Sequence, residues 1–395
     1  MPRERKKAIL ALEDGTVFHG IAFGAATTQT GEVCFNTSMT GYQEILTDPS
    51  YRGQFVTMTC PLIGNYGVSK ADAESSAIHV RGFVIEELCD VPSNWRSELS
   101  LHEYLLEAGV PGIEGIDTRA LTKRLRVAGA MRATLCTDGS LDADAAVEAA
   151  RQAPPMEGSD FVKEVTTPEA YHWDPDGKLS RQWTIVNPAL SEILEESDGQ
   201  VYHPLGDPKY RIVAYDFGIK LNILRSLRQK GFEVEVVNSR TPASEVLARN
   251  PDGIFLSNGP GDPAALDYIH TEIRQIVEKK PIFGICLGHQ VLAHAFGGTT
   301  FKLKFGHRGG NHPVKDLRSG KIAITAQNHG FAADGDSLPS HVEVTHINLN
   351  DGTVEGMRHR DYPVFSVQYH PEAAPGPNDA SYFFDEFANL IDQSR

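Results

Sequence analysis

The second half of this chain shows a regular alternation of strand and helix patterns, which constrains its fold more than any other feature. Buried-strand patterns recur at Ile212–Asp216, Glu233–Asn238, Gly253–Leu256 and Ile282–Ile285. Stretches with helical spacing are found at Ile219–Lys230, Pro242–Arg249, Ala264–Lys279 and His289–Phe296. Strands that alternate with helices are joined by right-handed crossovers and form a parallel sheet. We therefore predict a mainly parallel α/β domain over residues 210–395.

Beyond Gly297 the pattern changes, and short strands dominate up to a closing helix. These strands are predicted at Val342–Asn348, Val354–Arg358 and Val364–Tyr369. In the closing helix one face carries five apolar residues: Phe383, Phe384, Phe387, Leu390 and Ile391. An apolar stripe at helical spacing packs into a core, so we assign these aromatic residues to packing.

The first 140 residues show short strand patterns separated by turns, with helical segments among them. The strands are predicted at Lys7–Leu12, Thr16–Phe23, Val33–Asn36, Phe55–Thr59 and Val80–Ile85, and the helices at Leu101–Ala108 and Asp117–Ala128. This pattern predicts a strand-rich α+β domain over residues 1–140. Between residues 141 and 209 prolines interrupt the patterns, which favours a linker with local structure.

Length, charge and cysteine usage narrow the functional classes. A chain of 395 residues exceeds one ordinary core and predicts two domains. The net charge of −15 would repel phosphate backbones, so we expect no nucleic-acid partner. No apolar stretch approaches the length of a membrane span, so we expect no membrane association. The five cysteines are odd in number and form no CxxC pair, which favours a reducing, cytoplasmic location.

The most informative short segment is Gly284-Ile-Cys-Leu-Gly288, which lies between a buried strand and a helix. A Gly-x-nucleophile-x-Gly turn in this position raises the nucleophile into a strained, exposed conformation. The glycines leave room for the sharp turn, and the helix N-terminus favours a thiolate at Cys286. An isolated pattern of this kind is equally compatible with a structural cysteine beside a tight turn, so the assignment depends on its partners.

His370 is the best candidate for a base among the 15 histidines. It ends the strand Val364–Tyr369, and Glu372 follows closely enough to orient its imidazole. A nucleophile, a base and an orienting acid make up an acyl-transfer triad. His289 is the rival base, three residues after the candidate nucleophile, but it lies within a helix and has no acid nearby.

The remaining histidines point less clearly to chemistry. His294, His329 and His346 are assigned to packing or hydrogen bonding. His307 and His312 would suggest a metal site, but no cysteine or carboxylate spacing supports one and no HExxH motif is present. We therefore predict no metal site in this chain.

A third element of the predicted site is the loop Ser257-Asn-Gly-Pro-Gly-Asp262, which follows a predicted parallel strand. Two glycines and a proline make a rigid loop with free backbone N–H groups at the sheet edge where ligands bind. One of these N–H groups, together with that of Leu287, is a candidate oxyanion hole. Taken alone, the loop would be an ordinary turn.

Together, Gly259-Pro-Gly261, Gly284-Ile-Cys-Leu-Gly288 and His370-Pro-Glu372 resemble the class I, or triad, glutamine amidotransferase family. The N-terminal half resembles one branch of it, the small subunits of glutamine-dependent carbamoyl-phosphate synthetases. The matching segments are the run Gly31–Tyr51, Pro61-Leu-Ile-Gly-Asn65, Gly115-Ile-Asp-Thr-Arg119 and Ala326-Gln-Asn-His-Gly-Phe331. The resemblance is weakest between residues 141 and 210. It implies a flavodoxin-like α/β amidotransferase domain behind an N-terminal docking domain.

The resemblance implies specific roles for residues of this chain. The implied triad is Cys286, His370 and Glu372. The implied glutamine contacts come from Ser50, Gly259, Gly261, Leu287, Gln290, Asn328, Gly330 and Phe331. All of these motif positions are intact in this sequence. Lys220 lies where the amidotransferase domain begins, and nothing in its sequence surroundings predicts a chemical role.

The implied chemistry is hydrolysis of glutamine through a γ-glutamyl thioester, with His370 protonating the departing ammonia and then activating water. No phosphate-cradling motif is present, so we expect no cofactor in this chain. By resemblance, the partner is a separate large subunit, which binds ATP and Mg and makes carbamoyl phosphate from bicarbonate for arginine and pyrimidine synthesis.

Two alternatives stay open at this point. A free-standing glutaminase or γ-glutamyl hydrolase of the same fold predicts full activity without a partner and leaves the N-terminal extension unexplained. A non-catalytic binding protein is disfavoured by the intact Cys286, His370 and Glu372, and trapping of a thioester with glutamine would distinguish it.

Overall fold

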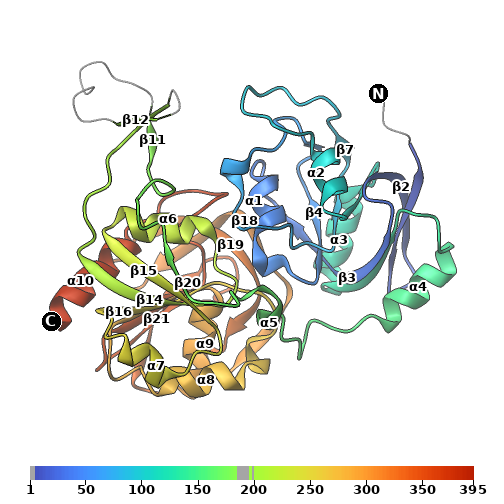
Figure 1. Cartoon of the computed structure of the whole chain (residues 1–395). Helices are drawn as coiled ribbons and strands as arrows, with labels where there is room; N and C mark the ends of the chain where they lie inside the picture. Colours follow the sequence, from blue (N-terminus) through green and yellow to red (C-terminus); the bar gives the residue numbers. More distant parts are fainter. Residues whose placement is uncertain (1–4, 185–194, 198–199) are drawn as a thin grey trace.

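A computed structural model describes residues 5–184, 195–197 and 200–395 of the chain. Two bodies lie side by side: a barrel domain built from the N-terminal strands and an α/β domain built from residue 210 onward (Figure 1). Residues 185–194 and 198–199 of the predicted linker lie outside the described residues, as do residues 1–4 at the N-terminus. Among the described residues, no helix is long and apolar enough to cross a bilayer.

The barrel domain closes seven strands into a ring with the order β1-β2-β8-β6-β4-β3-β9. The strands are β1 (Lys7–Leu12), β2 (Val17–Gly24), β3 (Thr28–Asn36), β4 (Gln54–Met58), β6 (Gly82–Val84), β8 (Pro111–Glu114) and β9 (Met131–Cys136). Successive side chains alternate between two apolar clusters, as the period of a strand requires. Val33 and Phe35 join one cluster, whereas Cys34 between them joins the other. The strand-rich α+β prediction is confirmed.

Short helices cover the barrel and begin where the sequence offers caps. Helix α2 (Leu101–Glu107) starts with a capping box formed by Ser100 and Glu103. Helix α3 (Thr118–Ala128) starts at Asp117, whose side chain accepts from the N–H of Ala120. Helix α1 (Tyr42–Thr47) lies on the side of the barrel that faces the α/β domain (Figure 1).

The α/β domain is built on a ten-stranded sheet with the order β10-β15-β14-β16-β17-β22-β21-β20-β18-β19. Its five parallel strands are β14 (Tyr210–Asp216), β15 (Phe232–Asn238), β16 (Gly253–Leu256), β17 (Ile282–Ile285) and β22 (Val364–Val367). In chain order they lie 2-1-3-4-5 across the sheet, which is the flavodoxin-like order. The predicted mainly parallel, flavodoxin-like α/β domain is therefore confirmed.

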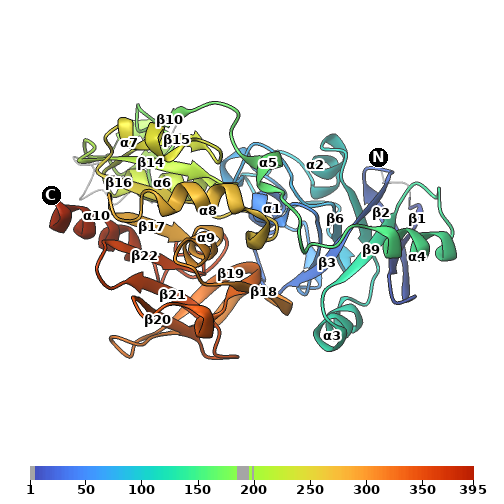
Figure 2. The same ribbon diagram turned by 90° about the horizontal axis from the view of Figure 1, so that it is seen from below.

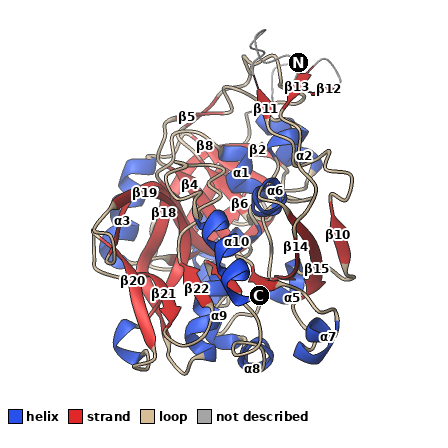
Figure 3. Ribbon diagram, turned by 90° about the vertical axis from the view of Figure 1, so that its left-hand side faces the viewer, coloured by secondary structure: helices blue, strands red, loops and turns tan. Residues whose placement is uncertain are grey.

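Helices cover both faces of this sheet. Apolar residues of α6 (Leu221–Gln229) and α10 (Phe383–Ser394) form one buried cluster with the strands. Those of α7 (Ala243–Ala248), α8 (Asp267–Arg274) and α9 (Leu287–Ala295) form another on the opposite face. Helix α10 lies in front of the sheet in Figure 3, and α8, on the other face, lies in front of it in Figure 2, which views the molecule from below. The aromatic stripe of the closing helix packs into the core, as predicted.

Two predictions about the α/β domain were wrong. The helix expected over Ala264–Lys279 is shorter, because a 3-10 turn at Pro263–Ala265 precedes α8 and irregular turns follow it. The strands beyond Gly297 are not all short: β18 (Thr300–Asp316) and β19 (Ile322–Ala333) form a long hairpin. Two register shifts in β18 interrupt the alternation that marks a strand in the sequence. The strands β20 (Val342–Asn348) and β21 (Val354–His359) connect this hairpin to the sheet.

The segment between the two bodies has structure of its own. Helix α4 (Ala143–Gln152) packs Ala146 and Val147 against the first barrel strand. A single turn, α5 (Val162–Val165), follows, and β10 (Tyr171–Trp173) pairs with β15 at the edge of the α/β sheet. Two further small sheets are formed by β5 (Leu62–Ile63) with β7 (Glu87–Leu88), and by β11 (Trp183–Thr184), β12 (Glu195–Ser197) and β13 (Gln200–Tyr202).

Candidate active site

Cys286 lies on a strained turn between β17 and α9. Its φ of 53° and ψ of −102° are unusual for a residue with a side chain, and such conformations cluster at active sites. The turn is held from both sides, because the Cys286 N–H donates to the Val367 carbonyl at 2.9 Å and the Gly288 N–H donates to the Ser257 carbonyl at 2.9 Å. The predicted strand–cysteine–helix elbow is present.

The two glycines of the elbow are required by close backbone contacts. A Cβ atom on Gly288 would lie 2.3 Å from the Leu256 carbonyl oxygen, and one on Gly284 would lie 2.9 Å from the Gly288 backbone. Gly259 in the neighbouring loop is equally constrained, since its Cβ would lie 2.2 Å from the carbonyl oxygen of Phe217. These contacts bring the Ser257–Asp262 loop against the elbow.

His370 and Glu372 form a buried pair directly after β22. The distance from His370 Nδ1 to Glu372 Oε1 is 2.7 Å, and both side chains are almost fully buried. Glu372 accepts a second contact from Lys220 Nζ at 3.0 Å, while the same ammonium donates to the Ala373 carbonyl at 2.6 Å. Because Nδ1 faces the carboxylate, the other ring nitrogen of His370, Nε2, is left for chemistry, and no hydrogen-bond partner is found for it among the described residues.

Electrostatics stabilise the charged forms of this pair. Burial alone would lower the pKa of His370, but the Glu372 carboxylate and the nearby Cys286 thiol raise it to about 10. Burial opposes ionisation of Glu372, yet the charges of Lys220 and His370 lower its pKa to about 2. A positively charged imidazole beside a thiol favours the thiolate, which is the nucleophilic form of cysteine.

His289, the rival base, lies in a different environment. It is completely buried in α9, and its Nδ1 pairs with the Ser366 hydroxyl at 2.9 Å. Burial lowers the pKa of His289 to about 3, so the ring stays neutral at ordinary pH. No carboxylate orients it, which makes it a packing residue rather than a base.

A cavity opens in front of Cys286, and most of the residues predicted to contact glutamine line it. They are Ser50, Gly259, Gly261, Gln290, Asn328, Gly330 and Phe331. Leu287 differs, because its side chain packs into the apolar core and only its backbone remains available. His370 lines a second, adjacent cavity that shares Asn328 with the first and includes Asp48 and Lys220. The structure therefore places His370 in a cavity next to the one in front of Cys286.

The side chains of the cavity are held by hydrogen bonds. The Gln290 amide donates to the Phe331 carbonyl at 2.7 Å, and the Asn328 amide donates to Asp48 Oδ2 at 2.7 Å. The Asn258 amide donates to the Ser50 hydroxyl at 2.9 Å. Asp48 and Ser50 belong to the barrel domain, so two domains build the cavity together.

Several residues of the site were not predicted from the sequence. The most important of them is Lys220. Its ammonium contacts the Glu372 carboxylate, although its neighbours in the sequence suggest no role. Arg308, Gln54 and Met156 also line the cavity, and Met156 belongs to the predicted linker. The one clue to Lys220 in the sequence is its position in the loop that follows the predicted strand Ile212–Asp216. Ligands bind at the carboxyl ends of parallel strands, so residues of such loops lie near the site.

One cluster has the donor types of a metal site, contrary to the sequence argument that no carboxylate accompanies the histidines. Ligand atoms of His307, His329 and Glu355 lie within 4.8 Å of one another, and all three residues are buried. Both histidines also have protein partners: His329 Nδ1 meets the Phe331 carbonyl at 2.7 Å and His307 Nε2 meets Asp351 at 2.8 Å. These contacts connect the cluster to Phe331 of the cavity wall.

Comparison with known proteins supports this description. A family model for glutamine amidotransferase class-I matches residues 213–390, and one for the CPSase domain of the carbamoyl-phosphate synthase small chain matches residues 10–135. The chain is 58% identical to the carbamoyl phosphate synthase small chain of Akkermansia muciniphila, with 98% of each chain covered. It is 55% identical to that of Syntrophotalea carbinolica, covering 98% of this chain and 99% of that one. The protein of the same name from Salmonella typhimurium is 52% identical over 99% of this chain and 98% of its own.

Proposed function

The chain belongs to the carbamoyl phosphate synthase small chain family, and from this membership and the geometry of the site we propose that it is the glutamine-hydrolysing subunit of such a synthase. It converts glutamine to glutamate and ammonia, and the ammonia serves a large ATP-dependent subunit that makes carbamoyl phosphate from bicarbonate. The observation that carries this proposal is the strained Cys286 turn, which faces a polar cavity and has the buried His370–Glu372 pair beside it.

In the proposed reaction, the Cys286 thiolate attacks the side-chain carbonyl carbon of glutamine. The carbon–nitrogen bond then breaks, the departing nitrogen takes a proton from His370, and ammonia leaves a γ-glutamyl thioester. His370, now neutral, removes a proton from water, and the resulting attack on the thioester releases glutamate and restores the thiolate. Glu372 keeps the imidazole in the orientation and tautomer that these steps need.

The lining residues suggest how glutamine is held. Ser50, Gln290 and Asn328 offer side-chain polar groups, whereas Gly259, Gly261, Gly330 and Phe331 offer backbone groups. Leu287, next to Cys286 in the chain, offers its backbone N–H as well. Backbone N–H groups of Gly259 and Leu287 are the candidates for stabilising the oxyanion of the tetrahedral intermediate. The remaining donors are suited to the charged α-amino and α-carboxylate ends of an amino acid.

We further propose where this chain acts and what it needs. The large subunit carries ATP and Mg, and this chain requires no cofactor for its own step. The barrel domain is the docking platform for the large subunit, because the small-chain family model covers that domain. The complex works in the cytoplasm in arginine and pyrimidine synthesis, without nucleic acid or membrane.

The test of the proposal replaces the nucleophile. Cys286→Ser should remove glutamine hydrolysis while the complex with the large subunit still makes carbamoyl phosphate from added ammonia. Cys89→Ser, which changes a half-buried cysteine of the barrel domain, is the matched control and should retain both activities. Iodoacetamide should label Cys286 in preference to the other cysteines, and glutamine should protect it. Retained glutamine hydrolysis in the Cys286→Ser complex would contradict the assignment.

A further inference from the structure

Glu74 is a carboxylate of the barrel domain that is buried against the α/β domain. It is only 2% exposed and lies in the segment between β5 and the barrel strand β6. Its Oε2 accepts a hydrogen bond at 2.9 Å from the backbone N–H of Asn222, 148 residues away in the sequence. Its Oε1 lies 3.5 Å from Arg225. A buried carboxylate is costly unless it is paired, so these contacts hold it in place.

Both contacts fall on the N-terminal half of helix α6, which has no cap of its own. The side chain of the residue before the helix, Lys220, makes no capping hydrogen bond. Glu74 caps the helix instead: its carboxylate accepts from the N–H of Asn222, and its backbone carbonyl accepts from that of Leu221 at 2.8 Å. The first N–H groups of a helix have no partner within it, and a carboxylate there also complements the helix dipole.

The turn that Glu74 caps is the turn that holds the triad acid. Lys220 contacts the Glu372 carboxylate at 3.0 Å, and the Asn222 amide donates to the Glu372 backbone carbonyl at 2.6 Å. Glu372 in turn holds His370 at 2.7 Å. One uninterrupted series of hydrogen bonds therefore connects Glu74 to the base.

Glu74 is itself anchored beside the glutamine cavity. Its backbone N–H donates to the Thr47 hydroxyl at 2.9 Å, and the hydroxyl of the next residue, Ser75, donates to the Thr47 carbonyl at 2.6 Å. Thr47 ends helix α1 and is followed by Asp48, which binds the Asn328 amide in the cavity. These anchors use the backbone of Glu74 and the hydroxyl of Ser75, so the cavity wall keeps them when the Glu74 carboxylate is removed.

The charges around Glu74 are balanced. Two anions, Glu74 and Glu372, face two cations of α6, Lys220 and Arg225. Burial raises the pKa of Glu74 to about 7, although both cations oppose this. The ionised form of Glu74 is the form that pairs with Arg225 and caps the helix.

We propose that Glu74 is a positioning residue for glutamine hydrolysis: by capping α6 from the barrel domain, it holds Lys220 and Asn222 where they fix Glu372 and, through it, His370. This inference rests on the proposed function. It assigns to the barrel domain a part in building the triad, in addition to docking.

The test compares three variants of the full chain in complex with the large subunit. Glu74→Ala removes the cap and the charge, and we expect kcat for glutamine hydrolysis to fall roughly 10- to 100-fold, since displacement of a reacting group by about 1 Å has such an effect. KM for glutamine should change much less than kcat, because the cavity contacts remain. Glu74→Gln keeps an oxygen that accepts from Asn222, so it should restore most of the lost kcat.

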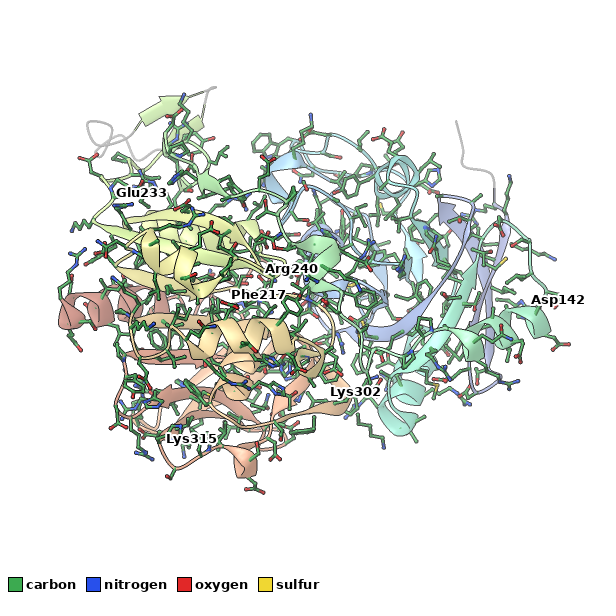
Figure 4. All side chains as sticks on the ribbon, turned by 60° about the horizontal axis from the view of Figure 1, so that its bottom comes forward. Asp142, Phe217, Glu233, Arg240, Lys302 and Lys315 are labelled. Atoms are coloured by element: carbon green, nitrogen blue, oxygen red, sulfur yellow. The ribbon has the colours of Figure 1, made fainter. Side chains whose placement is uncertain are left out.

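Asp142→Ala is the matched control, because Asp142 caps helix α4 at the far end of the barrel domain (Figure 4). It should lower the melting temperature by a few degrees, as lost caps do, and leave kcat unchanged. In Glu74→Ala, glutamine should still protect Cys286 from iodoacetamide, which shows that the cavity is folded. A kcat of Glu74→Ala equal to wild type would overturn the inference, as would an equal loss in Asp142→Ala. A wild-type complex that does not hydrolyse glutamine would overturn the proposed function itself.

Discussion

Lys220 illustrates how one buried side chain sets the chemistry of the triad. Its ammonium is the strongest influence that keeps the Glu372 carboxylate ionised against the effect of burial. An ionised Glu372 in turn keeps His370 oriented and basic. The lysine touches neither the nucleophile nor the base in the described contacts, so it acts by stabilising the charge of the acid.

We expect Lys220→Met to impair glutamine hydrolysis strongly at constant KM. The variant fills the space but leaves Glu372 without its ammonium partner, and breaking a buried ion pair typically costs about 3–5 kcal/mol. Thermal unfolding and kcat report the two consequences. Lys302→Met is the control: Lys302 pairs with Glu32 and Glu157 at the boundary of the domains (Figure 4), outside the triad. A normal kcat in Lys220→Met would contradict the role given to the ammonium.

The raised pKa of His370 predicts how the stability of the protein depends on pH. A group whose pKa is higher in the folded state contributes stability that is fully present below its unfolded pKa and is lost as the pH rises through the folded value. For His370 this window runs from about 6.5 to about 10. The wild type should therefore have a higher melting temperature than His370→Asn. The difference between the two should be largest near pH 6 and should shrink toward pH 10. A difference that grows over this range would contradict the raised pKa.

At the residue scale, the sequence predicts the groups that are proposed to react but not those that support them. Cys286 and His370 stand in short motifs whose geometry is local, so their neighbours in the chain reveal them. Lys220 reaches Glu372 across 152 residues, and Glu74 reaches α6 across 148. The first contact depends on how the α/β domain folds and the second on how the two domains pack, and no local spacing encodes either.

The elbow between β17 and α9 is the element on which catalysis depends most directly. Its shape follows from the two glycines, because backbone atoms occupy the space that side chains would need. The same reasoning explains why the sequence predicts the turn, because two glycines at a strand–helix junction indicate a sharp bend. The role of the cysteine within it is predicted only together with His370 and Glu372.

We expect Gly288→Ala to lower both stability and activity. The added Cβ would lie 2.3 Å from the Leu256 carbonyl oxygen, so the helix must move away from the strand, at a cost of about 1–3 kcal/mol. This shift also moves Cys286, and kcat should fall with it. Gly206→Ala is the control, because a Cβ there meets no atom within 4 Å. Circular dichroism melting and glutamate release measure the effects, and equal behaviour of the two variants would contradict this account of the elbow.

Other elements show which structures the sequence patterns predict and which they miss. The parallel strands and their helices are predicted because each has a strong period of its own. The long strand β18 is not predicted from the sequence. Gly306 and Gly309 have positive φ, and two register shifts interrupt the alternation of inward and outward side chains. Yet this strand contributes Arg308 to the cavity wall, so the missed element is also a functional one.

At the scale of the whole molecule, the site belongs to neither domain alone. The barrel domain supplies Ser50, and the connecting segment supplies Met156, to the cavity in front of Cys286, which lies in the α/β domain. Asp48 of the barrel domain holds Asn328 of the same cavity. The same connecting segment holds the loop beside the elbow, because the Asp262 N–H donates to the Ser159 carbonyl at 2.9 Å. The sequence predicts two domains but not this shared construction, which arises only when they pack.

The last prediction concerns how the docking of a partner reaches the site. If the large subunit binds the barrel domain, it binds the body that carries Asp48, Ser50 and Glu74, so docking and catalysis share a structure. A coupling free energy of about 1–3 kcal/mol between loose and ordered forms gives roughly 5- to 150-fold stimulation. We expect the isolated full chain to hydrolyse glutamine slowly and the large subunit to raise this rate at least several-fold. A chain that begins at Tyr210 should bind no large subunit, show no stimulation and have a lower basal rate than the full chain, because its cavity lacks one wall. Glutamate release with and without the large subunit, together with circular dichroism of both chains, makes the comparison. Equal rates in all four conditions would instead favour a free-standing glutaminase.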